Sequence, residues 1–172
     1  MIRVGIGGWT YEPWRGLFYP EKLLKTKELA HASRRVTSIE VNGTFYSTFT
    51  PSVFRRWAQE TPDDFIFSLM APRFAVNRRI LAEARPSIEK FLASGVAELK
   101  SKLGPILWQL PPTKKYDPED IAAFLELLPK KNDGLKLRHA LEVRNESFRS
   151  ADFIAQVREA GVAVVLADSE NT

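Results

Sequence analysis

Two glutamates, Glu40 and Glu142, each lie within a short β-rich run of this 172-residue sequence. Successive side chains of a strand point to opposite faces, so both carboxylates face away from their apolar neighbours. A carboxylate inside a fold is costly unless it is paired. Two such groups with separated pKa values can act as a general acid and a general base, which makes Glu40 and Glu142 our catalytic candidates. The alternative is a structural network in which Arg144 or Asn42 compensates the carboxylates.

Other polar and aromatic residues follow runs of the same kind and could bind a ligand. A guanidinium can hold a phosphate or a carboxylate through two hydrogen bonds, which suits Arg144 and Arg73 to an anion, although each could instead be a structural or solvated charge. Aromatic side chains with polar tips suit stacking on a sugar or base, or packing of a loop onto the fold. The ligand-binding candidates are Trp9, Tyr11, Asn42, Tyr46, Arg73, Gln109, Arg144 and Asp168.

The sequence indicates no particular cofactor. Cysteine is absent, and the two histidines are expected in a helix (His31) and at the start of a run (His139), so we expect no zinc site. A minor alternative is an all-oxygen magnesium or manganese site formed by Glu40, Glu142 and Asp168.

The position of these residues depends on the elements that carry them. Six β-rich runs alternate with helix-like stretches, a pattern that predicts parallel strands joined by crossover helices. Functional groups on such folds collect at the carboxyl ends of the strands, where most of the candidates lie. The six runs are Ile2–Gly8, Ser38–Asn42, Phe65–Met70, Ile106–Leu110, His139–Arg144 and Val162–Asp168.

The two faces of these runs differ, and the difference favours one architecture. One face is bulky and apolar, which suits packing under helices, while the other is smaller and carries polar groups. A flat sheet with helices on both sides needs two apolar faces, whereas a closed barrel has helices outside only. We therefore expect an α/β fold of the TIM-like β/α-barrel type rather than a doubly wound sheet. One of its helices is expected from about Arg85 to Leu103, ended by Gly104.

Only six β/α units are visible, whereas about eight are usual for this barrel. We therefore expect residues 1–172 to form a single β/α-barrel domain that lacks its C-terminal units. An apolar flank of the first and sixth strands should then lie open or be covered by something else. The lack of cysteine fits the cytoplasm, and no apolar run is long enough to cross a membrane. The net charge of +4 tolerates anionic ligands. The basic pairs, typical of a solvated surface, are Arg34–Arg35, Arg55–Arg56, Arg78–Arg79, Lys114–Lys115 and Lys130–Lys131.

Six motifs, in order along essentially the whole chain, resemble the YecE-like family, also called domain of unknown function 72. They are GGWTYEPWRGLFYP (Gly7–Pro20), IEVNGTFYSTFTP (Ile39–Pro51), TPDDFIFSLMAPRF (Thr61–Phe74), LGPILWQLPP (Leu103–Pro112), LEVRNESF (Leu141–Phe148) and VVLADS (Val164–Ser169). The resemblance implies a TIM barrel that continues for two more units. It implies no activity, because none is established for the family.

The chain departs from the family pattern near the expected barrel mouth. Family members typically have a lysine in place of Met70, a threonine–histidine pair in place of Val76–Asn77, and histidine–proline–serine–tryptophan in place of residues 145–148. The missing lysine and histidines favour a non-catalytic member.

Our leading hypothesis is a barrel that binds a small polar, anionic ligand at its mouth, with hydrolase or lyase chemistry by Glu40 and Glu142. We predict that Arg144 joins both glutamates in one hydrogen-bonded cluster. The alternatives are a nucleic-acid-binding protein that uses basic pairs and rim aromatics, and a non-catalytic family member. Phosphate-backbone binding would weaken steeply with salt, which separates the first alternative from a pocket ligand. The sequence leaves the substrate, the reaction and the oligomeric state open.

Overall fold

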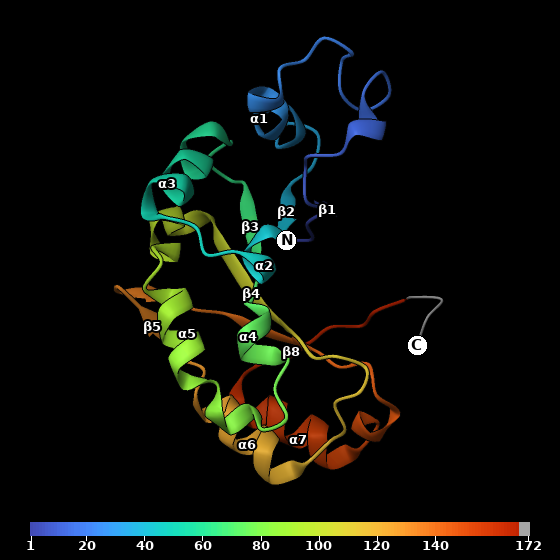
Figure 1. The fold of residues 1–172 in the computed structure, drawn as a ribbon, viewed down its shortest axis with the longest axis vertical. Coiled ribbons are helices and arrows are strands. Elements are labelled where there is room, and N and C mark those ends of the chain that lie inside the picture. Colours follow the sequence, from blue (N-terminus) through green and yellow to red (C-terminus); the bar gives the residue numbers. More distant parts are fainter. Residues whose placement is uncertain (169–172) are drawn as a thin grey trace.

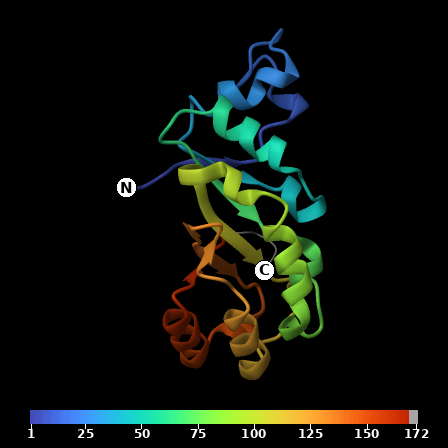
Figure 2. The same ribbon diagram turned by 90° about the vertical axis from the view of Figure 1, so that its left-hand side faces the viewer.

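The computed structural model describes residues 1–168. Its main element is a six-stranded parallel sheet in the order β1-β2-β3-β4-β7-β8, so consecutive units along the chain are neighbours in space. Figures 1 and 2 show an elongated arrangement, with the segment that contains α1 at one end of the long axis and α6 and α7 at the other. The strands are β1 (Gly5–Gly7), β2 (Ser38–Val41), β3 (Ile66–Met70), β4 (Leu103–Gln109), β7 (His139–Glu142) and β8 (Ala163–Val164).

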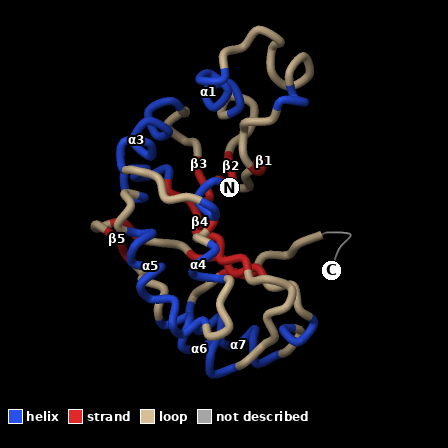
Figure 3. The backbone as a smooth tube through the Cα atoms, viewed as in Figure 1, coloured by secondary structure: helices blue, strands red, loops and turns tan. Residues whose placement is uncertain are grey.

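The helices lie along the outer side of the strands, as Figure 3 shows for α3, α5, α6 and α7. Short 3₁₀ helices are labelled η. The bounds of the helices are η1 (Glu12–Trp14), η2 (Lys25–Lys27), α1 (Glu28–Ala32), α2 (Gly43–Tyr46), α3 (Pro51–Glu60), α4 (Arg73–Val76), η3 (Leu81–Ala84), α5 (Arg85–Leu92), η4 (Val96–Lys102), α6 (Pro118–Glu126), η5 (Glu146–Phe148) and α7 (Ala151–Ala160). In the described residues, no helix combines the length and the apolar character that crossing a bilayer requires.

Alternation along the strands separates a buried face from an open one. Ile39, Phe67 and Trp108 are fully buried beneath the helices. Glu40 and Gln109, which point to the opposite face, are only partly buried. This arrangement confirms the predicted fold class, because parallel strands in chain order with helices on one side form the wall of a TIM-like β/α barrel.

The outermost strands of the sheet are β1 and β8, which do not pair with each other in the described residues. Apolar side chains at these flanks are open to solvent: Ile2 is 93% exposed and Leu166 is 98% exposed. In the described residues, the two outer strands are therefore each paired on one side only, with exposed apolar side chains in the adjoining segments.

The expected long helix from Arg85 to Leu103 is wrong, because α5 ends at Leu92 and Gly95 separates it from η4. That residue has φ 103°, and a Cβ there would lie 2.7 Å from Cα of Pro51 on α3. Gly104 does not end a helix either. It lies within β4, where a Cβ would come 2.5 Å from the carbonyl oxygen of Phe67 on the neighbouring strand, so a glycine lets the two strands approach.

A small antiparallel hairpin, β5 (Lys131–Asn132) and β6 (Leu135–Lys136), precedes β7 and was not expected. Its two turn residues, Asp133 and Gly134, both have positive φ angles, of 46° and 78°. An Asp-Gly pair with two positive φ angles is typical of a two-residue hairpin turn, so the sequence did carry this signal.

Candidate functional site

Glu142, the last residue of β7, is 5% exposed, and both of its carboxylate oxygens have partners. Arg144 contacts Oε1 through Nε and Nη2, each at 2.8 Å. Gln109, the register partner of Glu142 on β4, donates from Nε2 to Oε2 at 3.0 Å. The charge-assisted bonds fix this carboxylate in one orientation at the carboxyl end of the sheet.

Glu40 on β2 is in a different environment. Its register partners are Gly7 on β1 and Ser68 on β3, neither of which brings a charge. Burial raises the pKa of Glu40, and the negative charge of Glu142 raises this pKa further. The charge of Glu142 therefore acts on Glu40, but the surroundings of the two carboxylates differ.

The prediction that Glu40, Glu142 and Arg144 form one hydrogen-bonded cluster holds only in part. Arg144 does pair with Glu142. Within residues 1–168, however, no hydrogen bond or ion pair joins Glu40 to either of them. The reason is the sheet order: β3 and β4 lie between β2 and β7, and neighbouring strands are about 4.8 Å apart.

Asn42 follows β2 directly and does not pair with Glu40 either. Its Oδ1 is buried and accepts no hydrogen bond from the described residues. Its Nδ2 lies 3.4 Å from the position that a Cβ on Gly7 would take, so the amide borders the open edge strand β1. A buried acceptor without a partner is uncommon in proteins and suits a site that a ligand or water completes.

The two aromatic candidates nearest the N-terminus pack the first loop rather than stand free. Trp9 meets Trp57 of α3 edge to face, with ring centroids 5.3 Å apart. The Tyr11 hydroxyl donates to the carbonyl oxygen of Gly7 at 2.6 Å, and its ring contacts Trp14 at 4.6 Å. These contacts favour the packing interpretation for both residues.

Three further candidates are exposed around the same end of the sheet. Tyr46, at the end of α2, is 67% exposed. Arg73 begins α4, and its guanidinium carbon lies 5.0 Å from the ring centroid of Phe74. Asp168 is exposed and lies four residues beyond β8. None of the three contacts the Glu142 cluster through a hydrogen bond or ion pair in the described part of the chain.

Sequence reasoning treated two basic pairs, Arg78–Arg79 and Lys114–Lys115, as solvated surface. In the structure they line one cleft, of about 840 Å³, together with residues of the loops that follow β3 and β4. The signal that could have found it is the position of both pairs in the segments that connect β3 and β4 to the elements that follow them, where parallel sheets carry function.

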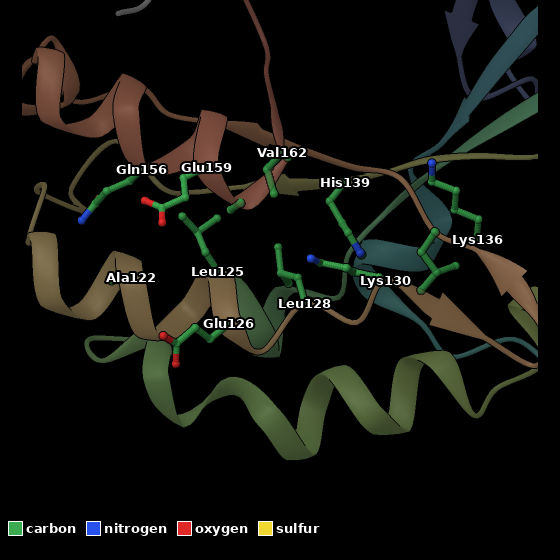
Figure 4. A pocket seen from close by; sticks show the side chains of 13 residues that line it. Ala122, Leu125, Glu126, Leu128, Lys130, Lys136, His139, Gln156, Glu159 and Val162 are labelled. Atoms are coloured by element: carbon green, nitrogen blue, oxygen red, sulfur yellow. The ribbon is translucent and has the colours of Figure 1, made fainter.

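A second cavity, of about 590 Å³, lies between α6 and α7 (Figure 4). It opens at the amino ends of the strands, because His139 begins β7 and Val162 directly precedes β8. Both ring nitrogens of His139 are engaged: Trp108 Nε1 donates to Nδ1 at 3.1 Å, and Nε2 lies 2.8 Å from the carbonyl oxygen of Pro129. This end of a barrel serves stability rather than catalysis.

The described residues do not form a cluster of side chains suited to binding a metal ion. Residues 1–168 contain no group of three or more histidine, cysteine, aspartate or glutamate side chains that could hold a metal ion. Glu40, Glu142 and the exposed Asp168 therefore do not form the all-oxygen site considered above.

Comparison with known proteins places the chain among proteins without an assigned activity. The model of the family described as "Protein of unknown function DUF72" matches residues 3–172. The UPF0759 protein YecE of Escherichia coli K12 is 29% identical over 143 residues, which cover 81% of this chain and 49% of that protein. The chain thus spans about half the length of the curated relatives that it matches.

Two crystal structures of DUF72 family proteins share the fold. The one from Thermotoga maritima MSB8 has a TM-score of 0.77 at 23% identity, over 98% of this chain and 65% of that chain. The one from Enterococcus faecalis V583 has a TM-score of 0.73 at 19% identity, over 98% of this chain and 63% of that chain. At these identities the likeness establishes the fold alone.

Proposed function

The chain belongs to the DUF72 family, and we propose that it is an enzyme that uses Glu40 and Glu142 for acid–base chemistry on a small polar ligand with an anionic group. The observation that carries the proposal is the unequal environment of the two carboxylates at one end of the sheet. Glu142 is held by Arg144 and Gln109, whereas Glu40 has no charged partner in the described residues. Paired carboxylates in unequal environments are the usual basis of a divided acid and base role.

In this proposal Glu40 is the proton donor. A carboxyl group whose pKa is raised by burial keeps its proton to a higher pH than an exposed glutamate and can pass it to a leaving group. Glu142 is the fixed carboxylate, which accepts a proton or orients a water molecule. Such a pair suits hydrolysis or elimination, the two reactions expected from the sequence.

Arg144 can hold the anionic group of the ligand. Two of its nitrogen atoms contact Glu142, but its side chain is still 32% exposed, so the rest of the guanidinium is open to a ligand. The unpartnered Oδ1 of Asn42 gives the opposite side of the site an acceptor. The proposal also places the protein in the cytoplasm, which rests on the cysteine-free sequence.

The test is turnover by the protein and by three variants. A panel of small hydroxy acids, keto acids and sugar phosphates is incubated in D2O, and ¹H NMR follows hydrolysis, elimination and deuterium incorporation. Glu40→Gln and Glu142→Gln should abolish turnover of any substrate found. Glu126→Gln is the matched control, because Glu126 is exposed and lines the cavity at the opposite end of the sheet.

A substrate that Glu40→Gln converts at the rate of the original protein would refute the role of Glu40. Absence of turnover across the panel, with ligands bound equally by the protein and by both mouth variants, would favour the non-catalytic alternative.

A further inference from the structure

The cleft between the loops that follow β3 and β4 is lined by four basic side chains and one acidic one. The basic residues are Arg78, Arg79, Lys114 and Lys115, and the acidic residue is Asp117. The carboxylate of Asp117 accepts hydrogen bonds from the backbone N–H groups of Glu119 and Asp120, as the N-cap of α6. The residues that line the cleft thus carry a net positive charge, with four cations and one carboxylate.

The two loops are braced against each other by a mostly buried ion pair. Lys114 Nζ lies 2.6 Å from Asp120 Oδ2 and donates to the carbonyl oxygen of Arg79 at 2.7 Å. Side chains of Lys114 and Asp120 are 10% and 9% exposed. Asp120 also accepts from the backbone N–H groups of Leu81 and Ala82. The interpretation of Lys114 as a solvated surface charge is therefore wrong.

This bracing is reflected in the titration of the aspartate. Burial by itself would raise the pKa of Asp120, but the hydrogen bonds from Lys114 and from the two backbone N–H groups outweigh it, and the pKa is lowered. The ion pair is therefore kept at neutral pH, and the loops are held in place before any ligand arrives.

The other three cations of the cleft differ in whether their charged groups already have hydrogen-bond partners in the protein. Arg78 donates to the carbonyl oxygen of Phe74 and to Oγ of Ser87, which fixes its guanidinium. Arg79 and Lys115 are exposed, and no ion pair or side-chain hydrogen bond engages their charged groups in the described residues. The cleft thus combines rigid walls with two cations, Arg79 and Lys115, that have no partner among residues 1–168.

The cleft adjoins the loop that carries Arg144. Asn145 Nδ2 donates to the carbonyl oxygen of Pro112 at 2.9 Å, and Pro112 follows directly on Pro111, which lines the cleft. Gln109, the partner of Glu142, lies two residues before Pro111 on the same segment. The segment from Gln109 to Pro111 therefore connects Glu142 with the cleft, and a ligand with one group at each would lie along this segment.

From this geometry we infer that the cleft is the phosphate subsite of the enzyme, so that its substrate carries a phosphate monoester, held by Arg79, Lys115 and Arg78, in addition to the anionic group that Arg144 holds. The inference rests on the proposed function for the position of the reacting part of the substrate. Guanidinium and ammonium groups on a braced loop are suited to phosphate, since each can form charge-assisted hydrogen bonds with its oxygens. A volume of about 840 Å³ suits one small molecule.

The experiment measures binding of inorganic phosphate and of glycerol phosphate to the whole chain by isothermal titration calorimetry. Arg79→Gln and Lys115→Gln should each weaken binding of both ligands about tenfold, and the double variant more, because each substitution removes a charge-assisted hydrogen bond to the phosphate oxygens. Lys131→Gln, an exposed basic residue on β5, is the matched control and should bind as the original protein does. Circular dichroism melts establish that all variants are folded.

The outcomes separate this inference from the acid–base proposal. Glu40→Gln should bind both phosphates with unchanged affinity and lose only turnover. If neither phosphate binds at millimolar concentration, or if Arg79→Gln and Lys115→Gln bind as the control does, the inference is overturned and the acid–base proposal stands. A single-stranded oligonucleotide that binds more tightly than glycerol phosphate, with steep salt dependence, would also overturn it in favour of nucleic acid.

Discussion

The strand β7 carries a buried titratable residue at each end, and the two are treated in opposite ways. His139 at the amino end is enclosed by Trp108 and the carbonyl oxygen of Pro129, and burial lowers its pKa. Glu142 at the carboxyl end forms an ion pair with Arg144, whose side chain reaches solvent. Burial disfavours the charged form of the histidine at one end, whereas the glutamate at the other end has a charged partner.

This difference shows how a single strand can serve both stability and chemistry. At the amino end, hydrogen bonds to neutral partners let an imidazole pack as a core residue against Trp108 of β4. At the carboxyl end, the helices give way to loops, and charged side chains remain accessible to ligands. Substitutions at the amino end should therefore act mainly on stability, and those at the carboxyl end mainly on binding.

The largest effect is expected for His139→Leu. The leucine cannot bond Trp108 Nε1 or the carbonyl oxygen of Pro129, and each buried polar group left without a partner costs about 1–3 kcal/mol. We expect the free energy of unfolding to fall by roughly 2–4 kcal/mol in urea titrations. His139→Gln, which keeps one donor, should lose less. A leucine variant as stable as the original protein would contradict the structural role of this end.

A smaller loss of stability is expected for Arg144→Met. Glu142 would keep Gln109 but lose its charged partner, at a cost of about 1–3 kcal/mol because the arginine is partly solvated. Binding of an anionic ligand should be lost, whereas Arg144→Lys should retain part of it. Thermal melts with and without a small hydroxy acid such as lactate, whose carboxylate is its only anionic group, measure both effects. A variant that loses stability but binds normally would make Arg144 purely structural.

The contrast between the two ends explains what the sequence could predict. Alternation along a strand is local, so it placed Glu40 and Glu142 on the open face and correctly paired Glu142 with Arg144 two residues away. The predicted contact between Glu40 and Arg144 across the sheet is wrong, because the distance from β2 to β7 depends on strand order and on the curvature of the sheet. Gly95 broke the expected helix for a reason outside its own segment, the close approach of Pro51. The basic cleft joins two loops, and periodicity carries no information on loops.

A pH titration of stability should show the effect of His139. Because its pKa in the folded protein is below the ordinary 6.5, the unfolded chain takes up a proton first as the pH falls. Stability should therefore decrease as the pH drops below 6.5 toward the lowered pKa, by at most about 1.4 kcal/mol per pH unit. The difference in unfolding free energy between the original protein and His139→Gln, measured in urea at several pH values, isolates this slope. An equal slope in both proteins would refute it.

The smallest effect, and the one of opposite sign, is expected for Glu40. Its pKa is raised above the ordinary 4.5 by burial and then by Glu142, so the folded protein holds this proton more tightly than the unfolded chain. The contribution of Glu40 to stability is thus complete below pH 4.5 and decreases as the pH rises through the raised pKa. The original protein should lose stability relative to Glu40→Gln over that interval, and the effect should be small because solvent reaches the carboxyl group. An ion pair between Glu40 and Arg144 would reverse the sign, so a relative gain of stability with rising pH would restore the three-residue cluster and end the division of roles between Glu40 and Glu142.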